Sequence, residues 1–198
     1  SFSNMHTEDL AWEGAYSYAQ YRFLSKDAVH AHLRMAAFAQ GGYSKNPLFY
    51  DELNVQGDIS GLQGGLIATQ LVNKLAVSST VSYIQALYDK EKLHHPYVVS
   101  KAMMYTLSAG YLVLPFEYKS YDQLNFNVYT EFLGQQSLSD KKTYFIDMAP
   151  AVQFIFNSNS KLNLGYRFQL RGNADRPMKE SFMMSFEHTF FNALRRKK

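Results

Sequence analysis

Cysteine is absent from the 198-residue chain, which excludes disulfides, thiolate nucleophiles and cysteine-based metal sites. Long apolar runs are also missing: no stretch reaches the roughly 18 apolar residues of a membrane-spanning helix. An excess of one charge is nearly absent, with 20 Lys and Arg against 17 Asp and Glu. This balance provides no basic stripe for nucleic acid, so no nucleic-acid partner is expected.

What the chain does have is aromatic content, with 15 Tyr and 15 Phe, and an alternation of apolar and polar residues along most of its length. A period of two is typical of β-strands with one apolar face. Nine candidate strands follow, at 10–24, 28–40, 61–73, 75–88, 100–114, 121–134, 142–156, 161–171 and 180–193. Most exceed the five or six residues common in soluble proteins, and they suffice for the roughly 9–11 residues with which a tilted strand crosses a bilayer.

The connections between these strands alternate in length. The short ones are 25–28, 73–74, 115–120 and 157–160, and the long ones are 41–60, 89–99, 134–141 and 172–180. Short periplasmic turns and longer extracellular loops are typical of outer-membrane barrels. Aromatic residues near the short turns, such as Tyr21, Phe116 and Phe156, fit an interfacial girdle, although aromatics are also good strand formers. The sequence therefore predicts an all-β, transmembrane, antiparallel up-and-down β-barrel in a bacterial outer membrane.

Two segments carry a resemblance to a known group of proteins. "LSAGYLVLPFEYKSYDQLNFNVYTEFLGQQ" and "IDMAPAVQFIFNSNSKLNLGYRFQL" resemble outer-membrane β-barrel proteins of Bacteroidota-type bacteria, a group largely without assigned function. The resemblance covers most of the chain from about residue 61 and implies a location rather than an activity. In that location, the expected partners are outer-membrane lipid or lipopolysaccharide and other outer-membrane proteins or lipoproteins. One departure is the C-terminal "TFFNALRRKK", which continues past the aromatic residue where such chains often end.

Topology adds an expectation about completeness. If the short turns are periplasmic, the last strand descends and the C-terminus is periplasmic, whereas residue 10 lies outside the cell. Single-chain bacterial barrels normally have an even number of strands and begin in the periplasm. We therefore expect residues 1–198 to form a single β-barrel domain that lacks an odd number of N-terminal strands from a barrel of about 10–12 strands, with 195–198 as a basic tail.

The period of two also assigns side chains to two faces. The predicted lipid-facing set includes Leu124, Phe126, Val128, Leu162, Leu164, Tyr166 and Phe168. The predicted polar network of the lumen contains Glu131, Asp147, Arg167, Gln169, Arg171 and Glu187. Asp147 is expected opposite Gln169 or Arg171, and Glu187 diagonal to Arg167. Such charges either pair to fill a narrow lumen or form a constriction that selects solutes.

The sequence also contains candidate residues for metal binding and for enzyme chemistry. His30 and His32 are expected on one strand face, a metal-ligand spacing to which Glu13 is a candidate third ligand; structural histidines are the alternative. No catalytic motif is present, and no catalytic residue or cofactor is predicted. His188 and Ser185 are candidate residues of an outer-membrane hydrolase site. The alternation of the strand, however, puts His188 on the lipid-facing side.

The sequence therefore favours an outer-membrane barrel that acts as a passive channel or as a structural component of a larger complex. The alternatives are an outer-membrane enzyme of lipid hydrolase or acyltransferase type and a soluble lipocalin-like barrel, whose interior would be apolar and whose exterior would be polar.

Overall fold

The computed structural model describes residues 2–3, 11–12, 14–45, 50–56, 59–87, 99–117, 120 and 122–190. Most of the expected loop 89–99 and the basic tail 195–198 therefore lie outside the described residues. Two short strands, β1 (Phe2–Ser3) and β2 (Ala11–Trp12), pair with each other. The nine long strands are β3 (Gly14–Asp27), β4 (Ala31–Ser44), β5 (Gly61–Val72), β6 (Leu75–Ala86), β7 (Lys101–Leu114), β8 (Asn125–Ser137), β9 (Tyr144–Phe156), β10 (Ser160–Gly172) and β11 (Glu180–His188).

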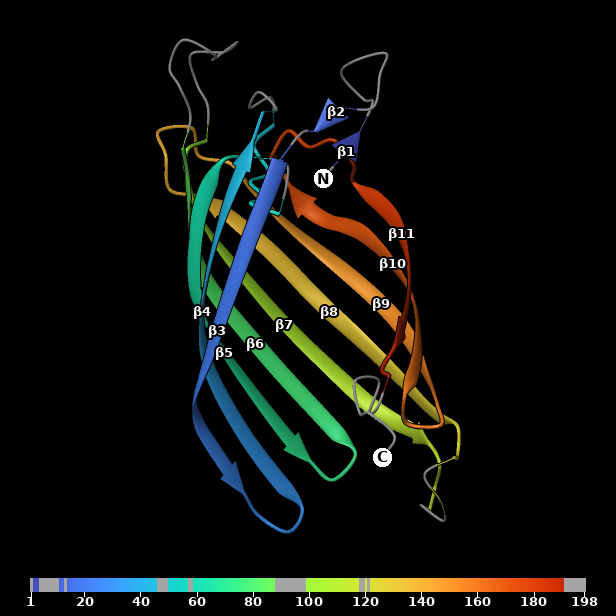
Figure 1. Cartoon of the computed structure of the whole chain (residues 1–198). Coiled ribbons are helices and arrows are strands. Elements are labelled where there is room, and N and C mark those ends of the chain that lie inside the picture. Colours follow the sequence, from blue (N-terminus) through green and yellow to red (C-terminus); the bar gives the residue numbers. More distant parts are fainter. Residues whose placement is uncertain are drawn as a thin grey trace, which may run out of the picture.

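The nine long strands form one antiparallel sheet in which neighbours in sequence are neighbours in space, in the order β3 to β11 (Figure 1). This arrangement confirms the prediction of an all-β, up-and-down sheet. Two tight turns show local reasons for their positions. Asn73 lies at φ 52° between β5 and β6, and Asn157 and Ser158 lie at φ 49° and 56° between β9 and β10. Asparagine tolerates this left-handed conformation, which hairpin turns require.

The connections alternate between the two ends of the sheet, as Figure 1 shows, but their lengths do not alternate throughout. Residues 115–124 connect β7 to β8 at the end that carries the tight turns, and this connection is longer than 138–143 at the other end. The expected rule of short and long loops is wrong here because β8 begins at Asn125, four residues later than predicted. The two ends are called the turn end and the loop end below.

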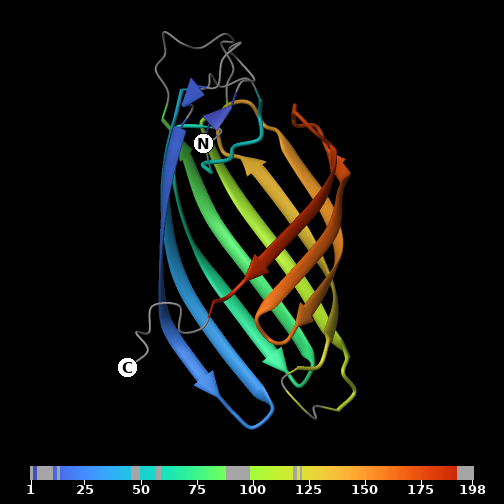
Figure 2. The same cartoon turned by 45° about the vertical axis from the view of Figure 1, so that its right-hand side comes forward.

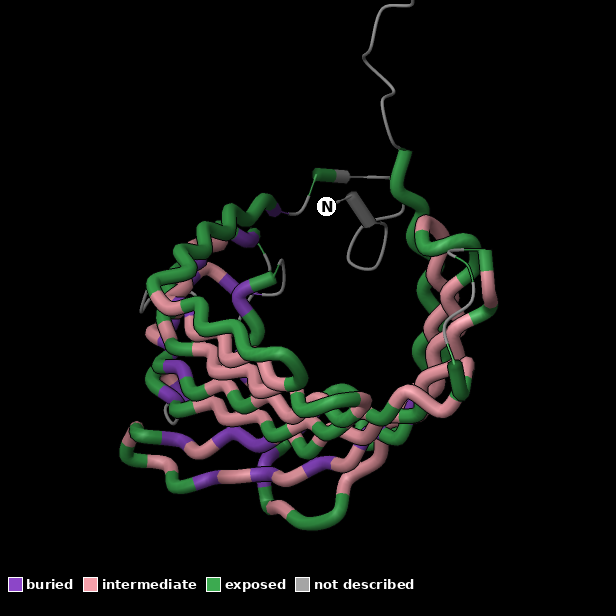
Figure 3. Tube along the Cα trace, turned by 90° about the horizontal axis from the view of Figure 1, so that it is seen from below, coloured by how far each residue is buried: buried purple, intermediate pink, exposed green. Residues whose placement is uncertain are grey.

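The sheet curls strongly and leaves an opening between its two edges, as Figure 3 shows. Among the described residues, β3 pairs only with β4, and β11 pairs only with β10. Both edge strands run from the loop end to the turn end (Figure 2). The sheet is therefore not closed, and the closed transmembrane barrel expected from the sequence stays a prediction.

The registers divide the side chains into an inner face, toward which the sheet curls, and an outer face. Ser108, Glu131 and Ala149 are cross-strand partners on the inner face, and their neighbours Leu107, Phe132 and Met148 are partners on the outer face. Bulky apolar residues recur on the outer face with exposed side chains: Leu62, Leu66, Val81, Tyr83, Met103, Leu107, Tyr111, Val128, Phe132, Leu164, Phe182, Met184 and Phe186. The predicted set Phe126, Val128, Leu162, Leu164, Tyr166 and Phe168 shares this face, and Leu124 precedes β8.

Candidate functional site

Residues 50–56 and 59–60 of the connection between β4 and β5 fold inward at the loop end of the sheet (Figures 1 and 2). These residues are called the plug segment below. Leu53, Val55 and Ile59 are buried there against a small apolar cluster on the inner face, made of Ile84, Ala86, Val99 and Ala102, with Met104 packed beside it. Burial of each large side chain stabilises this position by about 1.5–3 kcal/mol. The prediction of a loop over 41–60 is therefore wrong in part, because residues 41–44 belong to β4. The plug segment lies inside the open loop end of the sheet, which is called the mouth below.

Polar contacts fix the plug segment at its other end. The Nζ of Lys141 lies 2.7 Å from an Asp51 carboxylate oxygen, and the backbone N–H of Asp175 donates to the other oxygen at 2.9 Å. The backbone N–H of Asp51 donates in turn to the carbonyl of Asp175 at 2.9 Å. Gln135 of β8 accepts from the N–H of Leu53 at 3.1 Å. These contacts join the plug segment to β8, to the connection 138–143 and to the connection 173–179.

Gly42 of β4 makes room for the plug segment. A Cβ at this position would meet the carbonyl oxygen of Val55 and lie 3.2 Å from the carbonyl oxygen of Ile59. We expect Gly42→Val to displace the segment and to destabilise its docked state by about 1–3 kcal/mol. Since the chain has no cysteine, a single Leu53→Cys reporter can measure this: maleimide labelling should become at least about fivefold faster.

The adjacent glycine provides a matched control for this substitution. A Cβ at Gly41 points to the other face, where its nearest neighbour is the flexible side chain of Leu62 at 3.2 Å. Gly41→Val should leave the labelling rate of the Leu53→Cys reporter unchanged. Equal labelling rates in the two glycine variants would contradict the docked position of the plug segment.

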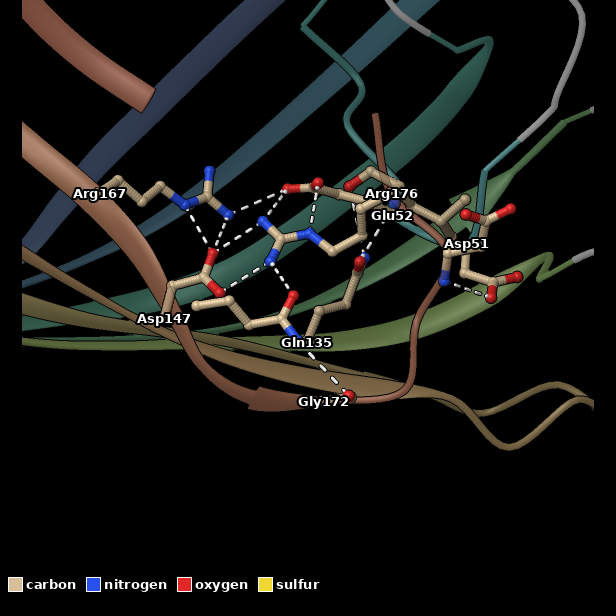
Figure 4. Close-up of polar contacts among 10 residues, drawn as sticks. Asp51, Glu52, Gln135, Asp147, Arg167, Gly172 and Arg176 are labelled. Atoms are coloured by element: carbon tan, nitrogen blue, oxygen red, sulfur yellow. Dashed lines mark hydrogen bonds and ion pairs between the residues drawn. The ribbon is translucent and has the colours of Figure 1, made fainter. Parts of the chain in front are cut away.

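A charged cluster lies beside the plug segment and consists of Glu52, Asp147, Arg167 and Arg176 (Figure 4). Asp147 of β9 is completely buried, and the Arg176 side chain is 2% exposed. Arg176 donates to both oxygens of Asp147, each at 2.7 Å, and the Nε of Arg167 donates to one of them at 2.7 Å. A buried carboxylate requires such pairing, because an isolated buried charge is strongly unfavourable.

Glu52 receives hydrogen bonds from both arginines on the opposite side of the cluster. Arg176 donates from Nε at 2.9 Å and from Nη2 at 3.3 Å, and Arg167 donates from Nη2 at 3.0 Å. The ring of Phe145 lies 3.8 Å from the Arg176 guanidinium carbon, a cation–π distance. Burial, the largest single influence, lowers the pKa of Arg176, but the hydrogen bonds and charges of Asp147 and Glu52 outweigh it and raise that pKa above its usual value.

The predicted lumen residues are only partly brought together. Asp147 lies directly opposite Gln169, as predicted. The expected pairing of Arg167 with Glu187 is wrong: the register puts Glu187 opposite Lys161, six pairs away from the Arg167–Ser181 pair. Glu187 is instead exposed, with its carboxylate 4.0 Å from the Nζ of Lys161.

Of the two remaining residues of the predicted lumen network, Arg171 and Glu131, only Glu131 lies on the inner face. A bulge between Gln169 and Arg171 places Arg171 opposite Ile146, on the outer face, so its expected inward position is wrong. Glu131 lies on the inner face as predicted and has a side-chain hydrogen bond with Thr106 rather than with the charged cluster.

A row of polar side chains crosses the inner face closer to the turn end. Asn127 donates to Gln153 at 3.0 Å, Gln153 donates to Asn163 at 2.7 Å, and Asn163 donates to Ser185 at 2.9 Å. These four residues are direct cross-strand partners on β8, β9, β10 and β11. The row satisfies the polar groups of neighbouring strands, and it gives the inner face a polar character that the outer face lacks.

The predicted histidine sites do not form as expected. β4 begins at Ala31, so His30 lies in the turn and does not share a strand face with His32. His32 contacts Asp27 at 2.5 Å, and Glu13 lies outside the described residues. No group of three His, Cys, Asp or Glu residues able to hold a metal occurs in the described part of the chain. His188 contacts Ser160 at 2.7 Å and points away from the face of Ser185, so this pair does not assemble.

No family model, curated protein or solved structure matches this chain. Over the residues that the structure describes, no helix is long and apolar enough to cross a membrane. The functional assignment therefore depends on the geometry of the sheet and of its mouth.

Proposed function

We propose that this chain is an integral outer-membrane β-barrel protein that serves as a passive channel or as the membrane-embedded component of a larger complex. The outer face carries this proposal: large apolar side chains such as Leu66, Leu107, Val128 and Met184 are exposed on it from β5 to the edge strand β11. Contiguous apolar surfaces of that extent are rare in soluble monomers. A bilayer covers such a surface, and the polar inner face then lines the lumen.

The plug segment favours a closed resting state over an open pore. Leu53, Val55 and Ile59 pack against the inner face at the loop end, and the ion pairs of the charged cluster lie beside them. A lipocalin-like barrel would offer a ligand an apolar interior, whereas Asn127, Gln153 and Asn163 give the inner face here a polar character. We therefore favour a structural membrane component, with solute passage dependent on displacement of the plug segment.

Detergent dependence tests the proposed location. The purified chain should stay folded and dispersed in detergent micelles, and it should aggregate when the detergent is removed unless lipid vesicles are supplied. The measurement is far-UV circular dichroism together with flotation of the protein with the vesicles. A monomeric, folded chain in detergent-free buffer would contradict the proposal.

Planar-bilayer recording separates the two functions that remain. A structural component should give no single-channel steps in its resting state, and deletion of 51–59 should produce them. Steps of equal size before and after the deletion would favour the open channel instead.

A further inference from the structure

The two arginines of the charged cluster bind the carboxylate of Glu52 between them, and this two-arginine site is called the pocket below. Arg176 provides Nε and Nη2 to the two Glu52 oxygens, and Arg167 provides Nη2 to one of them. A planar guanidinium that presents two donors to two carboxylate oxygens is the arrangement proteins use to recognise carboxylates. The group bound between the arginines is supplied by a connection, whereas Asp147 and Arg167 belong to long strands.

The pocket is held in place without Glu52. Asp147 accepts hydrogen bonds from both arginines on the side opposite Glu52. Phe145 stacks on the Arg176 guanidinium, and Gln169 accepts from Nη1 of Arg176 at 3.3 Å. With Arg176 buried and fixed on three sides, loss of the Glu52 carboxylate leaves donors in place and leaves one positive charge of the cluster uncompensated. That charge favours a negatively charged replacement.

We infer that this two-arginine pocket is a carboxylate-binding site that Glu52 occupies in cis, and that a small carboxylic acid in its ionised form takes the place of Glu52 when the plug segment withdraws. No covalent step is involved, and one carboxylate exchanges for another. The exchange links ligand binding to the position of the plug segment, because Glu52 and the buried Leu53 are neighbours in the chain. A carboxylate ligand therefore favours the open mouth.

Chemical rescue of a truncated side chain tests the inference. Glu52→Ala empties the pocket and should lower the melting temperature by roughly 3–10 °C. Millimolar sodium acetate should restore at least half of this loss, whereas sodium chloride at equal ionic strength should restore much less. The probe is acetate, and the measurement is thermal unfolding of the detergent-solubilised full chain followed by circular dichroism.

Two controls make the result specific. Glu52→Gln removes the charge but keeps a side chain of the same size in the pocket, so acetate should rescue it less than it rescues Glu52→Ala. Glu187→Ala removes an exposed carboxylate that lies 4.0 Å from the Nζ of Lys161, so acetate should shift the melting temperature of this variant no more than that of the wild type. Equal responses to acetate and chloride in Glu52→Ala, or equal acetate responses in Glu52→Ala and Glu187→Ala, would overturn the inference.

The outcome is independent of the proposed membrane function. A chain that folds without detergent but shows acetate-specific rescue of Glu52→Ala would retain the carboxylate site and lose the outer-membrane proposal. A chain that folds only with detergent or lipid vesicles, but whose Glu52→Ala variant is not rescued by acetate, would retain the outer-membrane proposal and lose the carboxylate site.

Discussion

Replacement of Arg176 by alanine is expected to destabilise the protein by about 3–5 kcal/mol. The substitution removes both hydrogen bonds that Arg176 makes to Asp147, a carboxylate with no exposed surface, and both that it makes to Glu52. Arg167 alone then compensates two carboxylates. The free energy of unfolding should be measured by denaturant titration of the refolded protein.

Arg171→Ala is the matched control for this prediction. Arg171 lies five residues earlier, on the exposed outer side of the β10 bulge. Its removal should change the free energy of unfolding by no more than about 0.5 kcal/mol. A loss below about 1 kcal/mol in Arg176→Ala would mean that the charged cluster contributes little to stability, as exposed ion pairs do.

Leu107→Arg is expected to lower the free energy of unfolding by a larger amount if the outer face contacts lipid than if it contacts water. Leu107 lies in the middle of β7 and is 51% exposed. If the outer face contacts lipid, an arginine at this depth should cost about 2–4 kcal/mol of unfolding free energy in vesicles. If the outer face contacts water, the same change should stay within about 0.5 kcal/mol, because an exposed leucine contributes little.

Leu87→Arg tests whether the cost of an arginine depends on depth in the membrane, because Leu87 is nearly as exposed as Leu107 but lies at the end of the sheet. Leu87 is 53% exposed and follows the last residue of β6 at the loop end. Its substitution should cost no more than about 1 kcal/mol in vesicles, since charged residues are tolerated near the membrane interface. Equal costs for the two leucine variants would argue against a bilayer around the outer face.

The sequence predicted the strands and their faces well because both depend on a period of two. All nine long strands overlap a predicted one, and residues such as Val128 and Leu164 lie on the predicted face. Strand ends were less predictable. β3 extends to Asp27 rather than to residue 24, because alternation alone does not define where a hairpin turns.

The charged cluster was predictable only in part. Asp147 and Arg167 lie on strands, so their parity placed both on the inner face. Glu52 and Arg176 lie on connections, where no periodicity indicates a direction. The inward turn of the plug segment follows from apolar burial far along the chain, at Ile84 and Ala102, and no local pattern encodes that contact. At Arg171 the parity rule failed because a bulge inserts one residue.

The common direction of the two edge strands limits how copies of this protein can associate. A rotation about the long axis of the sheet leaves the direction of every strand unchanged, so β3 of one copy would meet β11 of another in parallel. Parallel ladders are slightly less stable per residue than the antiparallel ladders within this sheet. The common direction of β3 and β11 therefore disfavours rings of identical copies joined edge to edge. A strand that runs from the turn end to the loop end would pair with either edge in the antiparallel direction.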